Sequence, residues 1–496
     1  MKKLNSKSST KTNNFIDDFF KSANKTGSWI LQNFKWPIVA HHYDADGIAA
    51  GSIVSIALSR NNIVHTTIMK SKFDLNACTD LKNLALSENQ PREIILTDFG
   101  SGQIEFVKSE LIDAGLKVAI LDHHVPSQKQ FEIDSKLFSQ TNCCLNGFDG
   151  GISASAATTC FCAFNSMSED SSLISTNIDL IPIALAGAVG DMQDLSGSFK
   201  DINLKVLELA INSNKIKLTN DLRIAGKSQD IVRFLAYCQQ PPIINIFSDL
   251  TASANLACQL LNCQLEENPH QFTYLSLSDS AREQFSIGLI NYCLENGMEE
   301  ESVKQLIGPN YRIINSSSFS TIDDVGELSL LLNACGRTNQ PDIALSLCKN
   351  DQSALIKAKQ ILSEYYQTIF ESINFARHHC DDYGAFYLVD ARGSIADYSI
   401  GSVIGAIIAS KTLPLIKPII GLSEDSAGMI KVSSRANKTL LELGINLDFA
   451  MRESSKLVGG VGGGHKVAAG ATIAQGTQNE FLKSLASIIE KQSSTK

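Results

Sequence analysis

The stretch Ile38-Val39-Ala40-His41-His42-Tyr43-Asp44-Ala45-Asp46-Gly47 decides the fold, because an apolar β-type run passes directly into carboxylates and imidazoles. The same arrangement recurs downstream, where apolar runs precede Asp98 and Asp122-His123-His124. The carboxyl ends of parallel strands meet at one crevice, where α/β sheets bind their ligands. The sequence therefore predicts a parallel sheet whose strand ends gather these side chains, with Asp191 delivered to the same place by a helix over 178–189.

The chemistry of this set indicates a metal site. Acidic side chains in such number repel one another unless cations lie between them. Hard oxygen ligands mixed with imidazole, and without thiolate, favour Mn²⁺, with Mg²⁺ as the alternative. Two such ions, about 3.5–4 Å apart, activate a bridging water and stabilise charge on phosphoryl oxygens. We therefore expect two divalent ions and hydrolysis of a phosphate ester.

Each motif taken alone has a simpler interpretation. Asp44 and Asp98 are also typical of turns and helix caps. A calcium loop counted from Asp44 needs an oxygen ligand near its fifth position and Glu at its twelfth. Ile48 and Ser55 stand there instead, so that alternative fails. The Asp122-His123-His124 triplet is the strongest single motif, because two imidazoles beside a carboxylate supply a ligand, a second donor and an orienting partner.

A second group of motifs lies near the C-terminal end. The glycines before His465 do not form a dinucleotide fingerprint, which should follow the first strand and open a helix. They indicate either a flexible linker or a loop whose N–H groups approach a phosphate, with His465 as a further donor. Arg435 is a second anion-binding candidate, because a guanidinium group suits phosphate. The predicted phosphate-binding residues are Arg435, Gly462, Gly463, Gly464 and His465.

Composition limits the class of protein. A chain of 496 residues is too long for one ordinary core, so we expect about two or three domains. The formal net charge of −9 argues against a general basic coat for nucleic acid. No run of about 18 uncharged apolar residues occurs, so no contact with a membrane is expected. The 12 cysteines are scattered, as is typical of reduced thiols in a cytoplasmic protein.

The order of strand-like and helical runs predicts an α/β fold with two sheets. Alternation from about 36 to 195, with helices over 47–60 and 75–86, indicates a parallel sheet covered on both faces. Two long helical stretches over 327–379 form a connector. The expected parts are a flexible N-terminal tail over 1–30, a catalytic domain over 31–200, a mainly helical middle region over 201–326, the connector over 327–383 and a smaller α/β substrate-binding domain over 384–496.

These residues, in this order, resemble the DHH phosphoesterase superfamily, which is named for the Asp-His-His motif. The Ser-Ser-Arg and Gly-Gly-Gly-His segments resemble its associated substrate-binding domain, DHHA1. The segment 333–337, Asn-Ala-Cys-Gly-Arg, is similar to the connector of RecJ-type single-strand exonucleases. The first motif is most similar to archaeal RecJ-like proteins, including nucleases that associate with the GINS replication complex. The resemblance covers roughly 36–195 and 327–473.

The resemblance implies a role for each residue. Asp44 would bind one metal and Asp46 the other, and Asp98 would bridge them. His123 and Asp191 would complete the ligand shell of the second metal. The two catalytic residues would be His124, facing the scissile phosphate, and Asp122, orienting the histidine pair. His42 would also bind metal, although bacterial RecJ-type sequences often carry Asp at that position. Arg435, His465 and the glycines between them would hold substrate phosphates.

The implied function is a metal-dependent exonuclease acting on single-stranded DNA or RNA. One alternative is a phosphodiesterase of short oligonucleotides or cyclic dinucleotides, which would share the same motifs. Another is a replication scaffold that binds its partners, such as GINS-type proteins, with little or no nuclease activity. The presence of all the acidic and histidine positions favours an active enzyme over the scaffold.

Overall fold

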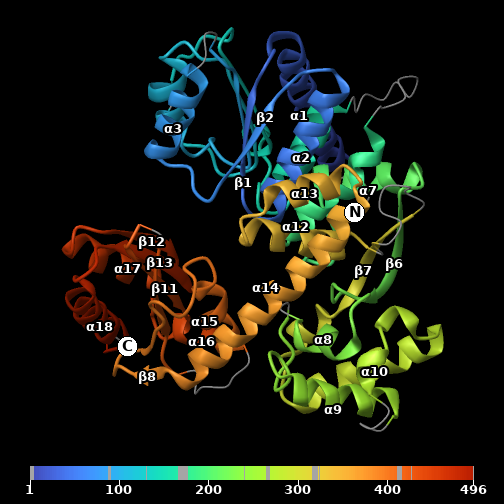
Figure 1. Cartoon of the computed structure of the whole chain (residues 1–496), viewed down its shortest axis with the longest axis vertical. Helices are drawn as coiled ribbons and strands as arrows, with labels where there is room; N and C mark the ends of the chain where they lie inside the picture. The colour runs from blue at the N-terminus through green and yellow to red at the C-terminus, as the bar shows by residue number, and fades with distance from the viewer. Residues whose placement is uncertain are drawn as a thin grey trace. The chain divides into compact units, whose positions relative to one another are not determined.

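The computed structural model describes residues 5–87, 91–129, 131–165, 177–238, 241–263, 268–314, 322, 324–409, 416–425 and 427–494 (Figure 1). The chain divides into two compact units. The first unit contains Met1–Gly226 and Ile307–Leu362, and the second contains Lys227–Leu306 and Ser363–Lys496. Each unit is built around its own sheet.

The first unit contains a five-stranded parallel sheet in the order β2-β1-β3-β4-β5. His41 of β1 lies opposite Thr97 of β3, which lies opposite Leu121 of β4, so the three strands end at the same level. This register confirms the predicted parallel sheet and its aligned strand ends. The strands are β1 (Ile38–His42), β2 (Thr66–Lys70), β3 (Ile94–Thr97), β4 (Val118–Asp122) and β5 (Phe138–Asn142).

Helices cover both faces of this sheet, because its central strands are apolar on both sides. On one face Ile38, Leu96 and Ile120 pack with α3 (Leu75–Leu86) and with the π-helical segment Val107–Ile112. On the other face α2 (Ala45–Arg60) packs against β1 (Figure 1). Three more helices complete that layer: α5 (Ala156–Phe164), α6 (Ile181–Gly190) and α7 (Asp201–Asn212).

The expected flexible tail over 1–30 is wrong for the residues from Asn14 onward, whose side chains the structure describes. Helix α1 (Asn5–Asn33) packs on α5 and β5, with Phe19, Ala23 and Ile30 fully buried. A side chain at Gly27 would overlap the Ala163 carbonyl oxygen, so the two helices touch through backbone. The apolar residues of α1 recur with the helical period and form a stripe along one side of the helix. Burial of this stripe stabilises the helix although the chain begins with polar residues.

Replacing Phe19 by Ala tests whether α1 is an integral part of the first unit. The ring is fully buried, so its removal should lower the free energy of unfolding by about 3–5 kcal/mol in urea titrations. Phe15→Ala is the matched control, because that ring is 51% exposed and its loss should change stability by only about 0.5 kcal/mol. Equal stability of the two variants would mean that the helix is not packed.

The middle of the chain contains an antiparallel pair of strands that the sequence did not indicate. Strand β6 (Ile216–Leu222) pairs with β7 (Ile307–Ile313), and both belong to the first unit. Between these strands, the chain from Lys227 to Leu306 belongs to the second unit and contains four helices in its described part. Its helices are α8 (Ile231–Ala236), α9 (Leu250–Leu261), α10 (Asp279–Glu295) and α11 (Glu300–Lys304).

The expected connector consists of three helices rather than two. These are α12 (Val325–Arg337), α13 (Pro341–Cys348) and α14 (Gln352–His378). Pro341 stands in the first turn of α13, where its missing N–H leaves no intrahelical bond unmade. The break at Asn339, which has a left-handed φ of 56°, separates α12 from α13.

The second unit contains a six-stranded sheet in the order β12-β13-β11-β10-β9-β8, which confirms the expected second sheet domain. Strands β9 and β10 run parallel, and the other neighbouring pairs run antiparallel. The strands are β8 (Cys380–Asp382), β9 (Tyr387–Asp390), β10 (Ile419–Glu424), β11 (Ile430–Arg435), β12 (Val461–His465) and β13 (Ala468–Ile473). The helices are α15 (Ile400–Ala409), α16 (Lys438–Glu442), α17 (Leu447–Leu457) and α18 (Gln478–Ser494).

The glycine-rich segment before His465 is an edge strand, not the loop that the sequence predicted. Strand β12 pairs with β13 and contacts α17, and at Gly462 and Gly464 there is no room for a side chain. A Cβ at Gly462 would lie 2.7 Å from the Met451 carbonyl oxygen, and one at Gly464 would lie 2.7 Å from that of Ala468. The glycines therefore permit close backbone packing here.

Within the described ranges, none of the helices combines the length and the apolar character that a membrane span requires.

Candidate metal centre

The turn between β1 and α2 brings two predicted ligands together. Asp44 caps α2, and its Oδ1 accepts the Gly47 N–H at 3.0 Å. A Cβ at Gly47 would lie 2.6 Å from the His42 carbonyl oxygen, so only glycine allows this tight turn. As a result His42 Nδ1 lies 2.8 Å from Asp44 Oδ2. Burial alone would lower the pKa of His42, but hydrogen bonding to Asp44 and Asp98 raises this pKa to about 11.

Asp46 lies on the first turn of α2 and is fully buried. Its two carboxylate oxygens accept the N–H groups of Ala156 (2.6 Å) and Ala157 (2.9 Å), at the N-terminus of α5. Burial, followed by the charge of Asp98, raises the pKa of Asp46 to about 7. The N-terminus of α5 therefore holds the carboxylate in place.

Asp98 lies between the two halves of the cluster. It follows β3 with a left-handed φ of 65°, which is uncommon for a residue other than glycine and is found at functional sites. One carboxylate oxygen, Oδ2, lies 3.3 Å from His42 Nδ1, and the other, Oδ1, lies 3.2 Å from His123 Nε2. Among the residues that the structure describes, none donates a hydrogen bond of good geometry to buried Oδ1, although His123 Nε2 lies close to it. An unsatisfied buried oxygen at this position fits a metal ligand.

Asp122 organises the loop after β4. It accepts the main-chain N–H groups of Ser101 at 3.0 Å and His123 at 2.7 Å, and it contacts His124 Nδ1 at 2.9 Å. Burial would raise the pKa of Asp122, but the His124 hydrogen bond lowers it to about 2. The His124 side chain is 56% exposed, whereas Asp122 is buried. The pair therefore offers one imidazole to solvent or substrate.

His123 is oriented for metal binding. Its Nδ1 lies 2.7 Å from the Gly150 carbonyl oxygen, which can only accept, so Nδ1 carries the hydrogen and Nε2 faces the carboxylates. That Nε2 lies 3.2 Å from both Asp98 Oδ1 and Asp191 Oδ2. Burial would lower the pKa of His123, but Asp98, Asp191 and Asp46 raise it well above its ordinary value. The raised pKa means that Nε2 holds a proton beside these carboxylates, and a bound cation would replace that proton.

Asp191 reaches the cluster from the C-terminal end of α6. Its main-chain N–H bonds to Gly187 O at 3.0 Å, so the helix geometry continues to Asp191 itself. A side chain at Gly187 would overlap the Asp46 carboxylate, so α6 approaches α2 through glycine. Burial and the charge of Asp46 raise the pKa of Asp191 well above its ordinary value.

Three overlapping groups of side chains can each hold a cation. One consists of Asp98, Asp122, His123 and His124, and the other two divide the predicted metal ligands between them, with Asp98 lying against both. His42, Asp44 and Asp98 place three ligand atoms within 4.8 Å of one another, as do Asp46, His123 and Asp191. Carboxylate oxygens with imidazole nitrogens suit Mn²⁺ or Mg²⁺. The structure thus brings together every predicted metal position, and the two predicted catalytic residues lie beside them.

The predicted phosphate-binding residues lie in the second unit. Arg435 ends β11, and its half-buried guanidinium donates to the Ser434 carbonyl at 2.9 Å beside Gly401 of α15. Burial lowers the pKa of Arg435. His465 is exposed at the end of β12. The Gly464 N–H already donates to Asp448 Oδ1 at 2.9 Å, so this amide is occupied by a carboxylate.

Sequence reasoning missed several neighbours of the cluster. Arg337, placed in the connector, lies 4.7 Å above the Tyr43 ring and donates to its hydroxyl at 2.9 Å. A side chain at Gly336 would overlap the Tyr43 carbonyl oxygen, which explains the glycine. The buried amides of Gln193 and Asn203 lie behind His123 and belong to no recognisable motif.

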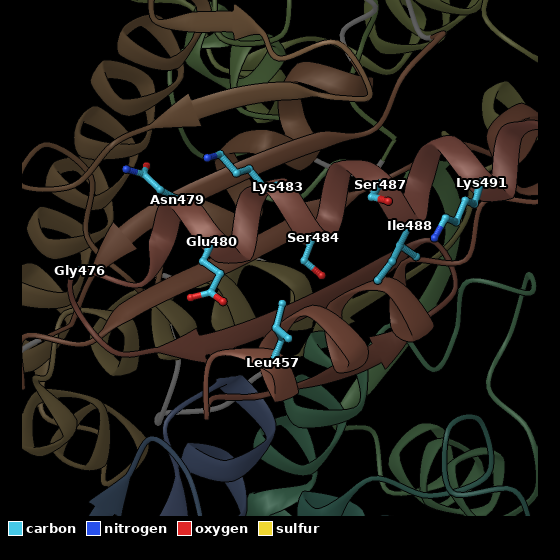
Figure 2. A pocket seen from close by; sticks show the side chains of 9 residues that line it. All are labelled: Leu457, Gly476, Asn479, Glu480, Lys483, Ser484, Ser487, Ile488 and Lys491. Carbon is cyan, nitrogen blue, oxygen red and sulfur yellow. The ribbon is translucent and has the colours of Figure 1, made fainter.

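A shallow groove of about 660 Å³ runs along α18 in the second unit (Figure 2). Figure 2 shows Glu480, Ser484 and Ile488 on the side of α18 that faces Leu457. None of the groove's lining residues is among the predicted site residues.

Two family models match the chain. The DHH family N-terminal domain matches residues 37–187, and the DHHA1 domain matches residues 393–491. The first range contains the cluster apart from Asp191, and the second contains Arg435 and His465. An uncharacterised protein of Methanocaldococcus jannaschii is 26% identical over 466 residues, which cover 93% of this chain and 95% of that protein.

The solved structures with a similar fold include RecJ and CDC45. RecJ of Thermus thermophilus in complex with Mn²⁺ is 14% identical with a TM-score of 0.54, covering 95% of this chain and 55% of that one. CDC45 of Entamoeba histolytica is 10% identical with a TM-score of 0.57, covering 96% and 98%. The chain therefore spans only about half of the Thermus RecJ chain. At these identities the likeness shows the shared fold.

Mn²⁺ should stabilise the protein after treatment with a chelator. Binding to the folded state alone raises the free energy of unfolding, by about 2.7 kcal/mol when free Mn²⁺ is 100 times its Kd. Asp98→Asn should abolish this gain, because it removes the carboxylate that lies against both ligand groups, while Asn tolerates the left-handed φ. Calorimetry measures the gain for both proteins. Asp80→Asn, on an exposed carboxylate paired with Lys70, should leave the gain unchanged.

Proposed function

The chain belongs to the DHH superfamily and has a RecJ-like fold, and on this premise we propose that it is a metal-dependent exonuclease of single-stranded DNA or RNA. The observation that carries the proposal is the pair of ligand groups meeting at Asp98, whose two oxygens face His42 on one side and His123 on the other. Such a site suits attack of an activated water on a phosphodiester. The preferred cofactor is Mn²⁺, with Mg²⁺ as the alternative.

Each ligand group would hold one ion. His42 and Asp44 would bind the first, Asp46, His123 and Asp191 would bind the second, and Asp98 would bind both. When bound, the two ions lower the pKa of a water and offset charge on the phosphate oxygens. The remaining work belongs to the protein, which must bind and orient the phosphate and manage its protons.

His124 is the residue best placed to contact the substrate phosphate. Its Nδ1 lies 2.9 Å from buried Asp122, which fixes the ring and leaves Nε2 facing outward. Imidazole N–H groups stabilise charge that develops on phosphate oxygens. Asp122 acts through His124, because its oxygens already accept the N–H groups of Ser101 and His123.

The second unit offers further phosphate contacts. Arg435 provides a permanent positive charge, and His465 is exposed at the end of a strand of glycines. Because Asp448 occupies the Gly464 N–H, we assign phosphate binding chiefly to these two side chains and to the backbone at Gly462 and Gly463. Single-stranded nucleic acid is the proposed substrate, and GINS-type replication proteins are the proposed partners.

An end-labelled nuclease assay tests the proposal. With Mn²⁺ the protein should shorten 5′- or 3′-labelled single strands from one end, and the label that is lost first reports the direction. Asp98→Asn and His124→Ala should each reduce the rate by about 100-fold or more, because each removes a ligand or a phosphate contact. Asp80→Asn should retain full activity.

Two outcomes would contradict this function. Faster cleavage of dinucleotides than of long single strands would identify the protein as a phosphodiesterase of short substrates. If wild type and Asp98→Asn were equally inactive with Mn²⁺ while replication proteins bound both, the protein would be a scaffold. Parallel DNA and RNA strands of one sequence measure the preference between the two nucleic acids.

A further inference from the structure

A chain of buried polar side chains lies behind the candidate metal centre. It consists of Gln193, Asn203 and Thr158, which we call the amide chain, and each of the three is 1% exposed or less. Buried amides are costly unless their hydrogen bonds are made. The hydrogen bonds of these three side chains connect the support of one proposed ligand, His123, with the support of another ligand of the same cation, Asp46.

Gln193 supports His123. Its Nε2 donates to the carbonyl oxygens of Gly150 at 3.0 Å and Ala154 at 3.2 Å. The same Gly150 oxygen lies 2.7 Å from His123 Nδ1. Gln193 therefore holds the Gly150 carbonyl in place, and this carbonyl determines the tautomer and the orientation of the His123 ring.

Asn203, on α7, is the next member of the amide chain. Its Nδ2 donates to Gln193 Oε1 at 2.6 Å, and its Oδ1 accepts the Thr158 hydroxyl at 2.8 Å. Since the Gln193 amide faces two carbonyl groups, its N–H₂ direction is set, and the direction of the Asn203 amide follows from it. The Thr158 hydroxyl has two acceptors, Asn203 Oδ1 at 2.8 Å and the Ser155 carbonyl oxygen at 3.0 Å. The two amides therefore have one consistent hydrogen-bond pattern.

Thr158 connects this pattern to Asp46. The Ser155 N–H donates to Thr158 Oγ1 at 2.8 Å, in the capping box that begins α5. The next two N–H groups of that helix start, those of Ala156 and Ala157, hold the Asp46 carboxylate. One end of the amide chain therefore supports His123 and the other supports Asp46.

The end of α6 places Gln193 in this position. Met192 has a left-handed φ of 59°, and the Met192 and Gln193 N–H groups bond back to Val189 O and Ala188 O at 2.9 and 3.0 Å. This ending reverses the chain after Asp191. The reversal lets Asp191 face the cluster while Gln193 turns into the core.

We propose that Gln193 and Asn203 are positioning residues that align His123 and Asp46 for one of the two cations. The inference rests on the proposed function, because it concerns the metal site on which that function depends. Neither residue touches the substrate or a cation. Their amides act through Gly150 and through the first turn of α5, as supporting bonds do around metal ligands in general.

Isothermal titration of the metal-free full chain with Mn²⁺ tests the proposal. Wild type should bind two ions. Gln193→Met and Asn203→Leu should weaken one of them by about 10–100-fold and leave the other unchanged, because His42 and Asp44 have separate supports. Thr158→Val removes the hydroxyl that joins Asn203 to the capping box of α5. Its loss of affinity should be smaller, because the Ala156 and Ala157 N–H groups still hold Asp46, and this variant tests the inference if the first two fold poorly.

Asn310→Leu is the matched control for loss of stability. This buried amide, on β7 of the same unit, donates to Leu222 O at 2.9 Å. Its replacement should lower the melting temperature as the test variants do, yet both Mn²⁺ ions should bind with wild-type affinity. The inference is wrong if Gln193→Met and Asn203→Leu also keep wild-type affinity, or if Asn310→Leu loses affinity equally. Failure of wild type to bind Mn²⁺ would instead overturn the proposed function, and this inference with it.

Discussion

Repulsion among buried carboxylates is the constraint on which the first unit depends. Asp46, Asp98 and Asp122 are each at most 3% exposed, and in a poorly solvated interior like charges repel strongly. Asp46 is held by the start of α5, and Asp122 by the main-chain N–H groups of Ser101 and His123. Dipolar N–H groups fix the positions of these acids without cancelling their charge. The negative potential that remains favours binding of a divalent cation. The hydrogen bonds that hold these acids in the folded protein therefore also preserve the charge that binds metal.

The cluster could be predicted from sequence because its ligands are covalently attached to strand ends. Asp98 follows Thr97, and Asp122 ends β4, so the register that aligns Thr97 with Leu121 also fixes the spacing of the acids. A buried parallel strand has a recognisable apolar pattern, and the residue after it has little freedom. The side-chain positions therefore follow from local sequence once the strand order is known. The assignment of each ligand to one of the two groups could not be predicted from sequence, because it depends on which carboxylate oxygen faces which imidazole ring.

Other features lacked a local signal. The polar residues at the start of the chain indicated a tail, although the residues that follow carry the apolar stripe of α1. The glycines of β12 are typical of loops as well as of closely packed strands. The pairing of β6 with β7 joins segments that are far apart in the sequence. Gln193 and Asn203 belong to no motif with a characteristic spacing. The role of a buried amide can be assigned only when its hydrogen-bond partners are known. The partners of α1, of β6 and of Gln193 lie far away in the sequence. Strand β12 differs, because it pairs with the next strand, β13, and packs on the preceding helix, α17.

The pairing of β6 with β7 also bears on how such a protein can diverge. The chain leaves the first unit after Gly226 and returns at Ile307, and the register places Leu222 directly opposite Ile307. Exit and return are thus neighbours across one antiparallel ladder, whatever is built between them. The entropy of closing a loop grows only slowly with its length. A change in the length of segment 227–306 should therefore cost the first unit little, because the two ends of the segment stay joined through this ladder.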